Sequence, residues 1–313
     1  MQNIIIYDNF YKPEANMFAE KATEFLLSKN INCYVKEYTF SRFKNKYEND
    51  FLHIVADDCV VSNADCIISF GGDGTILSAV RQYINEEIPI MGFNVGKLGF
   101  LAEFSTVDLE KEIENLLNNQ FKIITRFTLQ AQLNQHTNHN MNALNMNALN
   151  ELNMNGNGLN IIALNDIVIE KNKSKMITVK AFVNRQYIAD YRADGLIITT
   201  PIGSTAYSLA CGGPILVPDS NVLCITPVSP HSLTLRPLVV PNDKEIMFQV
   251  FSPLGNANLV ADGSIVALIN SGDTIAISLS AKKIKLIVSS ENNYFEVIRK
   301  KLLWAEYSFH YSQ

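Results

Sequence analysis

The sequence predicts an α/β protein with a second, β-rich domain. In the first part of the chain, short apolar strands alternate with segments of helical periodicity, and a Gly-rich turn joins one such strand to a helix. The later part consists of short segments rich in β-branched residues. The length of 313 residues suits about two domains. We therefore predict an amino-terminal doubly wound domain of parallel strands, followed by an antiparallel, sandwich-like β domain.

Strands and helices alternate along the first part of the chain. Buried strands are indicated by short apolar runs, and helices by apolar residues that recur every three or four positions. The expected elements are a strand at 4–7, a helix from Pro13 to Leu27, a strand at 66–70, a helix over 76–84 and a strand at 88–93. Strands connected through helices pair in parallel. We therefore expect residues 1–125 to form one α/β domain.

From residue 126 the pattern changes to short β segments separated by turn signals. The expected strands lie at 167–169, 177–183, 187–191, 196–199 and 276–279. Their connections are too short for crossover helices, which favours antiparallel pairing. We expect this β-rich domain to span residues 126–288, and the segment 289–313 to return to the first domain.

An Asn-rich insert interrupts the β-rich domain between residues 132 and 160. The segment from Met141 to Asn145 is repeated at once from Met146 to Asn150. This composition favours turns and disorder over packing, so we interpret the insert as a loop expansion at the tip of a hairpin. Its two histidines have no fixed geometry, and we predict no metal site formed by protein side chains.

Composition excludes several classes of function. The chain has 26 basic and 31 acidic residues, which does not suit a protein that neutralises nucleic-acid phosphates. No apolar run approaches the roughly 18 residues of a membrane-spanning helix, and the amino terminus lacks a signal-peptide pattern. The five cysteines lack metal-ligand spacing and are interpreted as small buried apolar side chains. We expect a cytoplasmic protein that binds neither nucleic acid nor membrane.

The sequence Gly-Gly-Asp-Gly-Thr is the strongest local indication of chemistry. Glycines at the start of a helix let backbone amides approach an anion, and the helix terminus adds partial positive charge. The candidate phosphate-binding residues are Gly71, Gly72, Gly74 and Thr75. A carboxylate here would repel phosphate unless it accepts a proton from an attacking hydroxyl or holds a metal ion. We therefore interpret Asp73 as catalytic, against the alternative of a Gly-rich turn capped by an aspartate.

Two further segments carry glycines and hydroxyl groups. Residues 92–98 resemble a Walker A loop, but the glycines are one residue too close together and the following serine or threonine is missing, so we reject a P-loop. The segment from Asp194 to Pro214 combines a carboxylate, several hydroxyls and Tyr207. It would suit a polar ligand with an aromatic base.

Five segments together resemble the NAD kinase family. They are residues 71–75, 94–101, 164–166, 194–214 and 229–237, in that order. Five motifs in register are specific, and the resemblance spans most of the chain apart from the Asn-rich insert. It implies the same two-domain fold, with the carboxyl-terminal segment returning to the first domain. It also implies transfer of the γ-phosphoryl group of ATP to the 2′-hydroxyl of the adenosine ribose of NAD, which gives NADP.

The resemblance implies roles for residues around the Gly-rich turn. Asp73 matches the proton acceptor, and Gly74 beside it would contact the dinucleotide. Phe100 and Leu101 match positions that form a wall of the adenine site.

Further roles fall in the β-rich domain. Asn165 and Asp166 match the pair that hydrogen-bonds the ribose, a task suited to acceptors that face hydroxyl donors. Asp194 matches the carboxylate that reaches the nicotinamide part, with Arg192 near the pyrophosphate. The block that lines the dinucleotide matches Thr205, Ala206, Tyr207, Ser208, Leu209 and Ala210. Lys175 and Ser264 are further candidates, the second at a position where many relatives carry a longer amide side chain.

The implied ligands are small molecules. NAD and ATP are the substrates, and Mg²⁺ is implied because the triphosphate must be neutralised and bridged. No cluster of carboxylates is visible in the sequence, so phosphates and water would hold most of the metal's coordination sphere. The resemblance also implies a homodimer or homotetramer.

Two other hypotheses remain open from the sequence. A lipid or sphingoid-base kinase shares the Gly-rich turn, but it would need a membrane-facing surface that the sequence does not indicate. A non-catalytic dinucleotide sensor would keep the fold, and it would be favoured by the loss of Asp73, which is present.

Overall fold

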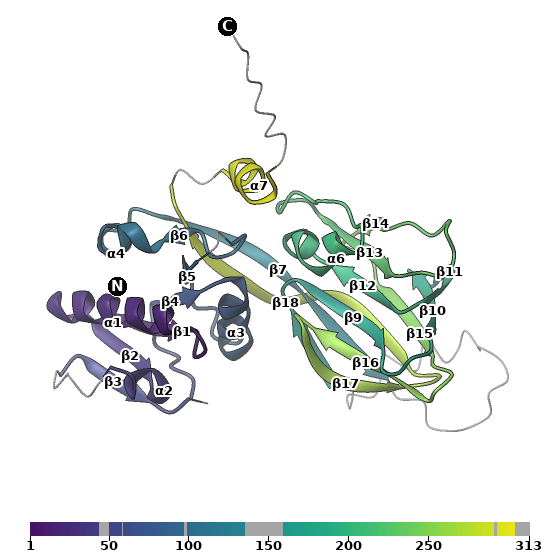
Figure 1. Cartoon of the computed structure of the whole chain (residues 1–313), viewed down its shortest axis with the longest axis horizontal. Helices are drawn as coiled ribbons and strands as arrows, with labels where there is room; N and C mark the ends of the chain where they lie inside the picture. The colour runs from purple at the N-terminus through teal and green to yellow at the C-terminus, as the bar shows by residue number, and fades with distance from the viewer. Residues whose placement is uncertain (44–49, 58, 97–98, 135–158, 291–292, 304–313) are drawn as a thin grey trace, which may run out of the picture. The chain divides into compact units, whose positions relative to one another are not determined.

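The computed structural model describes residues 1–43, 50–57, 59–96, 99–134, 159–290 and 293–303 (Figure 1). The chain divides into two compact units. The first comprises Met1–Thr125 and Ile284–Gln313, and the second comprises Arg126–Lys283. The last described helix therefore belongs to the unit in which the chain begins.

The first unit is built on a parallel sheet. Its elements are β1 (Asn3–Asp8), α1 (Pro13–Ser28), β2 (Asn32–Lys36), α2 (Glu37–Phe40), β3 (Leu52–Val55), β4 (Cys66–Gly71), α3 (Asp73–Tyr83), β5 (Ile90–Asn94), β6 (Phe104–Ser105), η1 (Thr106–Asp108), α4 (Leu109–Leu117) and α7 (Tyr294–Leu302). The strand order is β3-β2-β1-β4-β5, with the end of β18 (Thr274–Val288) beside β5, and these neighbours pair in parallel. The predicted parallel α/β fold is confirmed. Of the segment 289–313, the described helix α7 belongs to this unit.

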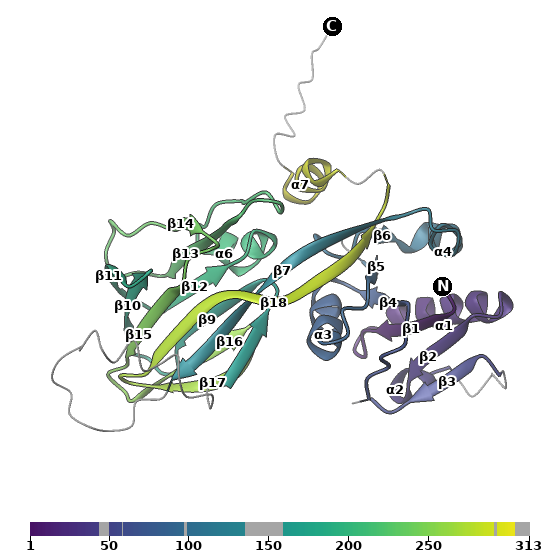
Figure 2. The ribbon, with the colours of Figure 1, turned by 180° about the vertical axis from the view of Figure 1, so that it is seen from behind.

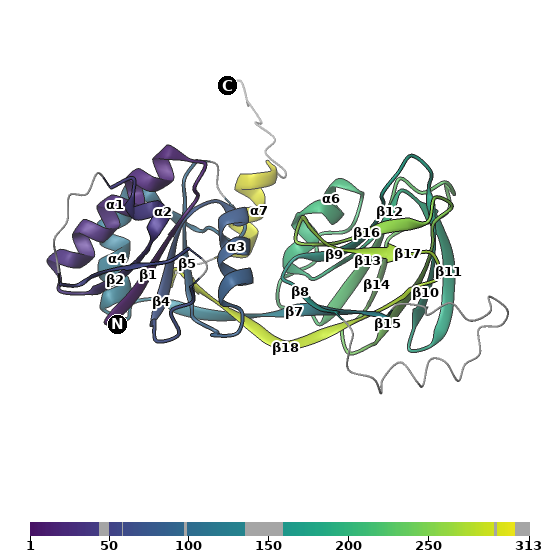
Figure 3. The ribbon, with the colours of Figure 1, turned by 90° about the horizontal axis from the view of Figure 1, so that it is seen from below.

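Helices cover both faces of this sheet (Figure 3). On one face, α1 and α4 pack on alternate strand residues such as Ile4, Ile6 and Ile68. On the other face, α3 lies close to β4 and β5. Gly92 permits this approach, because a Cβ at that position would lie 2.4 Å from Cδ1 of Ile76. The two-sided cover explains why the central strands are apolar throughout.

The Gly-rich turn follows the carboxyl end of β4. Gly71 pairs with Asn94 at the end of the neighbouring β5, and the Val95 amide donates to the Gly71 carbonyl over 2.7 Å. The turn and the loop after β5 therefore lie at the same edge of the sheet, which is where parallel sheets bind ligands.

The second unit contains two facing antiparallel sheets. Its elements are most of β7 (Lys122–Asn134), β8 (Leu159–Ala163), β9 (Asp166–Lys171), β10 (Ile177–Val183), β11 (Gln186–Ala193), β12 (Gly195–Thr199), η2 (Ile202–Thr205), α6 (Tyr207–Ala210), β13 (Val222–Val228), β14 (Leu238–Pro241), β15 (Ile246–Phe251), β16 (Asn256–Ala261), β17 (Ser264–Asn270) and most of β18. One sheet has the order β14-β13-β12-β9-β16-β17, and the other contains β11-β10-β15-β18 with β7 beside β18 (Figure 2). The predicted antiparallel β domain is confirmed.

The core of the second unit lies between its sheets. Ile167, Ile169 and Leu196 come from the first sheet, and Val179 and Phe248 come from the second. All five side chains are buried, as expected for strands whose inward faces meet in a sandwich.

Two sequence interpretations concern parts of this picture. The Asn-rich insert lies mostly outside the described residues, but β7 and β8 on either side of it pair antiparallel, with Leu133 opposite Leu159. The interpretation of the cysteines as buried is wrong for Cys59, which is exposed, and for Cys211, which is half-buried.

In the part of the chain that the structure describes, no helix has the length and apolar character needed to span a membrane.

Candidate active site

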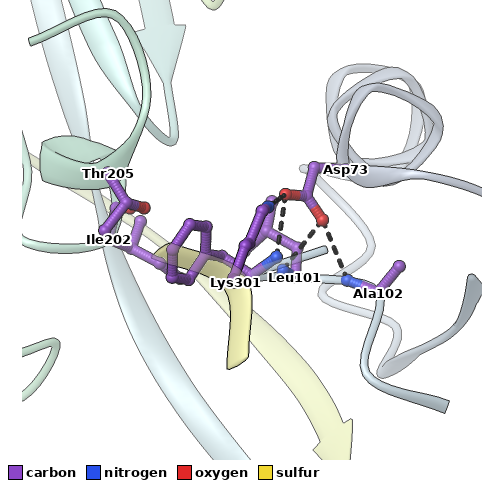
Figure 4. Close-up of polar contacts among 7 residues, drawn as sticks. Asp73, Leu101, Ala102, Ile202, Thr205 and Lys301 are labelled. Carbon is purple, nitrogen blue, oxygen red and sulfur yellow. Dashed lines mark hydrogen bonds and ion pairs between the residues drawn. The ribbon is translucent and has the colours of Figure 1, made fainter. Parts of the chain in front are cut away.

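The Asp73 carboxylate binds a loop distant in sequence. Asp73 is the first residue of α3, and its Oδ2 accepts from the Phe100 amide over 2.9 Å. Its Oδ1 accepts from the amides of Leu101 and Ala102 over 2.9 and 3.1 Å (Figure 4). The carboxylate is therefore held by the loop that follows β5, and three of the residues predicted for the site lie together.

A lysine from the carboxyl-terminal helix completes this group. The Nζ of Lys301 lies 3.4 Å from Oδ2 of Asp73 (Figure 4). The same nitrogen lies 4.0 Å from the centroid of the Phe100 ring. Each side chain of the ion pair is 29% exposed, so the pair remains open to solvent on one side. Lys301 was not among the predicted site residues, because 228 positions separate it from Asp73.

The glycines of the turn have different tasks. Thr75 is 5% exposed, and its hydroxyl accepts from the Gly72 amide over 3.4 Å, which caps α3. A Cβ on Gly71 would lie 2.0 Å from that hydroxyl oxygen, so Gly71 and Thr75 pack on each other. In contrast, a Cβ on Gly72 or Gly74 would meet nothing within 4 Å. Of the candidate phosphate-binding residues, Gly72 and Gly74 therefore have free space beside the α-carbon.

Gly99 is required for the position of Asp73. A Cβ at Gly99 would lie 2.1 Å from Oδ1 of Asp73, so Gly99→Ala must displace the carboxylate or its loop. We expect this variant to lower kcat about tenfold or more, since small displacements of reacting groups are costly. Steady-state kinetics and a thermal melt measure the effect. Gly74→Ala is the comparison: its methyl group meets open space and we expect no loss of melting temperature.

In the second unit, the Asn165–Asp166 turn is held by another aspartate. Asp262 Oδ2 accepts from the Leu164 amide over 2.8 Å, and Oδ1 accepts from the amides of Asn165 and Asp166 over 2.7 and 3.2 Å. The Asp262 amide in turn donates to the Asp166 carbonyl over 3.1 Å. Sequence reasoning missed Asp262, although its position before Gly263 in a two-residue hairpin turn is a signal for a fixed loop.

The hydroxyl-rich block packs directly on this turn. A Cβ on Gly203 would lie 2.1 Å from the Asn165 carbonyl oxygen, so the chain of η2 touches the turn backbone to backbone. The Thr200 hydroxyl donates to the Leu164 carbonyl over 2.7 Å. These contacts bring Asn165 and Asp166 together with the start of the block that follows Gly203.

Members of the block differ in exposure. Tyr207 is 43% exposed, whereas Ser208 is buried with its hydroxyl 2.9 Å from that of Thr226. The Thr205 hydroxyl donates to the Ile202 carbonyl over 3.3 Å (Figure 4). Of these three predicted residues, Tyr207 therefore has the most exposed side chain, and Thr205 is half-buried.

Asp166 is a titrating group at neutral pH. Burial raises its pKa to about 7, and the charge of the neighbouring Asp262 adds to the rise. The charge of Asp166 in turn contributes to the raised pKa of Tyr207 and of Cys211, after burial and other neighbours. The Asp166 carboxyl is therefore mostly anionic only above about pH 7.

This pKa predicts a pH dependence of stability. The folded chain holds the Asp166 proton to a higher pH than the unfolded chain, so the stability it contributes is complete below about pH 4 and is lost as pH rises to about 7. We expect Asp166→Asn to reduce the difference in unfolding free energy between pH 5 and pH 8 by about 2 to 3 kcal/mol. Urea denaturation at both pH values measures this. An equal difference in both proteins would exclude the shift.

The candidate residues for the nicotinamide part form a separate group. Asp194 pairs with Lys171 over 2.7 Å, a partner that sequence reasoning did not identify. Lys175 and Arg192 are exposed and lie at the same end of the β10–β11 pair, where Ile177 is opposite Ala193. The Asp194 carboxylate therefore already pairs with a lysine of the protein. From the sequence, we instead expected this carboxylate to contact the ligand.

The two groups of the second unit lie at opposite ends of the β9–β12 ladder. Gly195, next to Asp194, is opposite Glu170, whereas Thr199 is opposite Asp166. The six residues of β9 span about 17 Å at the usual rise of a strand. Ser264 starts β17 opposite Ala261, next to the Asp262 turn and hence at the Asp166 end. An extended ligand is needed to contact both ends.

Comparison with protein families identifies the chain's relationship. Residues 4–121 match the model of the ATP-NAD kinase N-terminal domain, and residues 164–289 match that of the ATP-NAD kinase C-terminal domain. The chain belongs to the ATP-NAD kinase family. The unmatched stretch between the two regions contains the Asn-rich insert.

Individual relatives agree with this assignment. The chain is 36% identical over 303 residues to the NAD kinase of Christiangramia forsetii, with 96% of this chain and 97% of that protein covered. It is 37% identical over 257 residues to the NAD kinase of Bacteroides fragilis, with 81% and 82% covered.

Solved structures share the fold. A yeast NADH kinase complexed with NADH matches with a TM-score of 0.85 at 24% identity, over 100% of this chain and 90% of that one. An NAD kinase from Archaeoglobus fulgidus in complex with ATP matches with a TM-score of 0.67 at 21% identity, over 97% and 99%.

Proposed function

We propose that this chain is an ATP-dependent NAD kinase, which transfers the γ-phosphoryl group of ATP to the 2′-hydroxyl of the adenosine ribose of NAD and produces NADP and ADP. Membership of the ATP-NAD kinase family supports the activity. The relatives in Christiangramia forsetii and Bacteroides fragilis are named NAD kinases. The observation that carries the chemistry is the fixed carboxylate of Asp73 at the ligand-binding edge of the parallel sheet.

In the proposed reaction, Asp73 accepts the proton of the attacking hydroxyl. The hydroxyl oxygen forms a bond to the γ-phosphorus, the bond from that phosphorus to the β–γ bridging oxygen breaks, and ADP leaves. Three backbone amides fix the carboxylate before substrate arrives, so little reorganisation is needed. A loose phosphoryl-transfer transition state depends more on positioning than on full deprotonation, and this arrangement suits that demand.

The remaining residues bind the dinucleotide in this proposal. Asn165 and Asp166 hydrogen-bond the ribose, and the Tyr207 block lines the ligand. Phe100 and Leu101 contact the adenine, while Asp194 binds the nicotinamide part. Support comes from the separation of the Asp166 and Asp194 ends of β9, which one nucleoside would not bridge. In this proposal Arg192 binds the pyrophosphate, and Lys175, which is exposed at the same end, is a further contact to the ligand. Ser264 belongs to the Asp166 end.

Magnesium enters this proposal as part of the substrate, bound to the ATP phosphates. Across the described residues, no group of three or more His, Cys, Asp or Glu side chains is arranged to hold a metal ion. The Asp73 oxygens already accept three amide hydrogen bonds and one ion pair, so the carboxylate is poorly suited to be a dedicated ligand. The open sides of Gly72 and Gly74 leave space for phosphate oxygens beside the start of α3, where the helix terminus adds partial positive charge.

The setting of the reaction is part of the same proposal. We place the enzyme in the cytoplasm, since all five cysteines are free, which suits a reducing compartment. We also expect a homodimer or homotetramer, which light scattering after size exclusion measures directly.

The test is incubation of the purified chain with NAD and MgATP, followed by an NADP-specific coupled assay. We expect stoichiometric formation of NADP and ADP. Binding of NAD without NADP formation would instead favour a dinucleotide sensor. Phosphorylation of a sphingoid base or diacylglycerol in place of NAD would favour a lipid kinase. The same assay with NADH, other nucleoside triphosphates and polyphosphate determines acceptor and donor preference.

A further inference from the structure

The position of Asp73 poses an electrostatic problem for the proposed function. The carboxylate must lie next to the γ-phosphoryl group of ATP, and both groups are anionic. Backbone amides supply only partial charges, and each of the three that reach Asp73 is already used in holding the carboxylate. A full positive charge beside Asp73 would reduce the repulsion.

Lys301 supplies this charge in the first unit. Its ammonium lies 3.4 Å from Oδ2 of Asp73, the oxygen that also accepts from the Phe100 amide. The same ammonium lies over the Phe100 ring at 4.0 Å from the centroid, a cation–π geometry. Among the described residues, it is the cationic side chain that pairs with Asp73. The loop, the carboxylate and the lysine therefore form one contiguous group.

The helix that carries Lys301 is anchored independently of this ion pair. The Asn293 side chain caps α7 by accepting from the Phe295 amide over 3.1 Å. Ile298 is 1% exposed, and Lys301 follows it by three positions, which places both on one face of the helix. Lys300 is different: it pairs with Glu296 on α7 itself, and its side chain is 65% exposed. Lys301 therefore reaches Asp73 from the packed face of α7, whereas Lys300 does not.

We infer that Lys301 is a positioning residue of the phosphoryl-transfer reaction. Its ammonium neutralises the Asp73 carboxylate so that the carboxylate tolerates an incoming triphosphate, and it fixes the Phe100 ring beside the same loop. This role rests on the proposed function, because it requires an anionic donor to approach Asp73. The Lys301 ammonium lies at Oδ2, which accepts one amide hydrogen bond, whereas Oδ1 accepts two.

The decisive variant is Lys301→Met, which keeps an apolar side chain on Phe100 and removes the charge. Loss of the positive charge should lower kcat/KM for MgATP. Because the pair is partly exposed and solvent screens it, we expect a fall of about tenfold or more rather than a complete loss. The dissociation constant of NAD, measured by calorimetry without ATP, should stay within about twofold. Lys301→Arg should restore most of the activity, and methylammonium added to the Lys301→Met protein should restore part of it. Lys300→Met is the matched control and should behave as the unmodified chain.

The outcomes separate this inference from the proposed function. If the unmodified chain forms no NADP, the proposed function fails. If that chain is active and Lys301→Met matches it, the inference is overturned. The inference is also overturned if the Met and Arg variants lose equal activity, if amine does not restore activity, or if both variants share a lowered melting temperature and weakened NAD binding. Those three results would indicate a role in folding alone.

Discussion

Asp73→Asn is expected to lower kcat for NADP formation by about a hundredfold to ten-thousandfold, the range that general-base catalysis supplies. The amide can no longer accept the proton of the hydroxyl. Its oxygen can still accept from the amides of Leu101 and Ala102, whereas its NH₂ group would face the Phe100 amide. Two of the three loop contacts therefore survive, and we expect the affinity for NAD to stay within a few-fold. Coupled kinetics and calorimetry measure the two quantities separately.

Asp73→Ala distinguishes the chemical role of the carboxylate from its structural role. Alanine removes all three acceptors of the loop amides, so both turnover and NAD affinity should fall. The difference in NAD affinity between the Asn and Ala variants measures the anchoring of the loop. Retention of more than about a tenth of the activity by Asp73→Asn would contradict proton acceptance by Asp73.

Asp262→Ala is expected to lower the free energy of unfolding of the second unit by about 3 kcal/mol, with about a tenfold loss of NAD affinity. The substitution leaves the amides of Leu164, Asn165 and Asp166 without their shared acceptor, and each orphaned donor costs about 1 to 3 kcal/mol when buried. The turn that carries the proposed ribose ligands would then lose its fixed shape. Urea denaturation and calorimetry with NAD measure the two effects.

Asp65→Ala is the matched control for this experiment. Asp65 also accepts backbone amide hydrogen bonds, from Gln2 and Asn3, but in the first unit and at an exposed position. Water can replace those bonds, so a smaller loss of stability and an unchanged affinity for NAD are expected. Equal effects of the two substitutions would show that Asp262 has no special part in shaping the Asn165–Asp166 turn.

Local sequence patterns predicted the apolar centre of the first unit accurately. The strand expected at 66–70 is β4 (Cys66–Gly71), and the helix expected from Pro13 to Leu27 is α1 (Pro13–Ser28). β2 and β3 were missed because they lie toward the edge of the sheet and mix polar with apolar residues. Burial on one face only weakens the apolar signal of such strands.

The long strand β18 shows a second limit of sequence patterns. Only its segment 276–279 was expected as a strand, whereas the structure continues it through Val288. The added part pairs in parallel with β5, with Leu286 opposite Ile90. Its strand conformation depends on a partner about 200 positions away, which no local window contains.

The sequence by itself determined the fold class and the family resemblance and pointed to Asp73 as the candidate catalytic carboxylate, because these depend on short patterns and on residue type. The tertiary structure alone decided which groups surround that carboxylate: the amides of the loop at Phe100 and the ammonium of Lys301. It also decided that Asp262 shapes the Asn165–Asp166 turn and that burial brings the pKa of Asp166 to about 7. Hydrogen bonds, charge pairs and desolvation act through space, so residues far apart in the chain determine the charge and hydrogen bonding of a group. The sequence specifies the type of that group but not its surroundings.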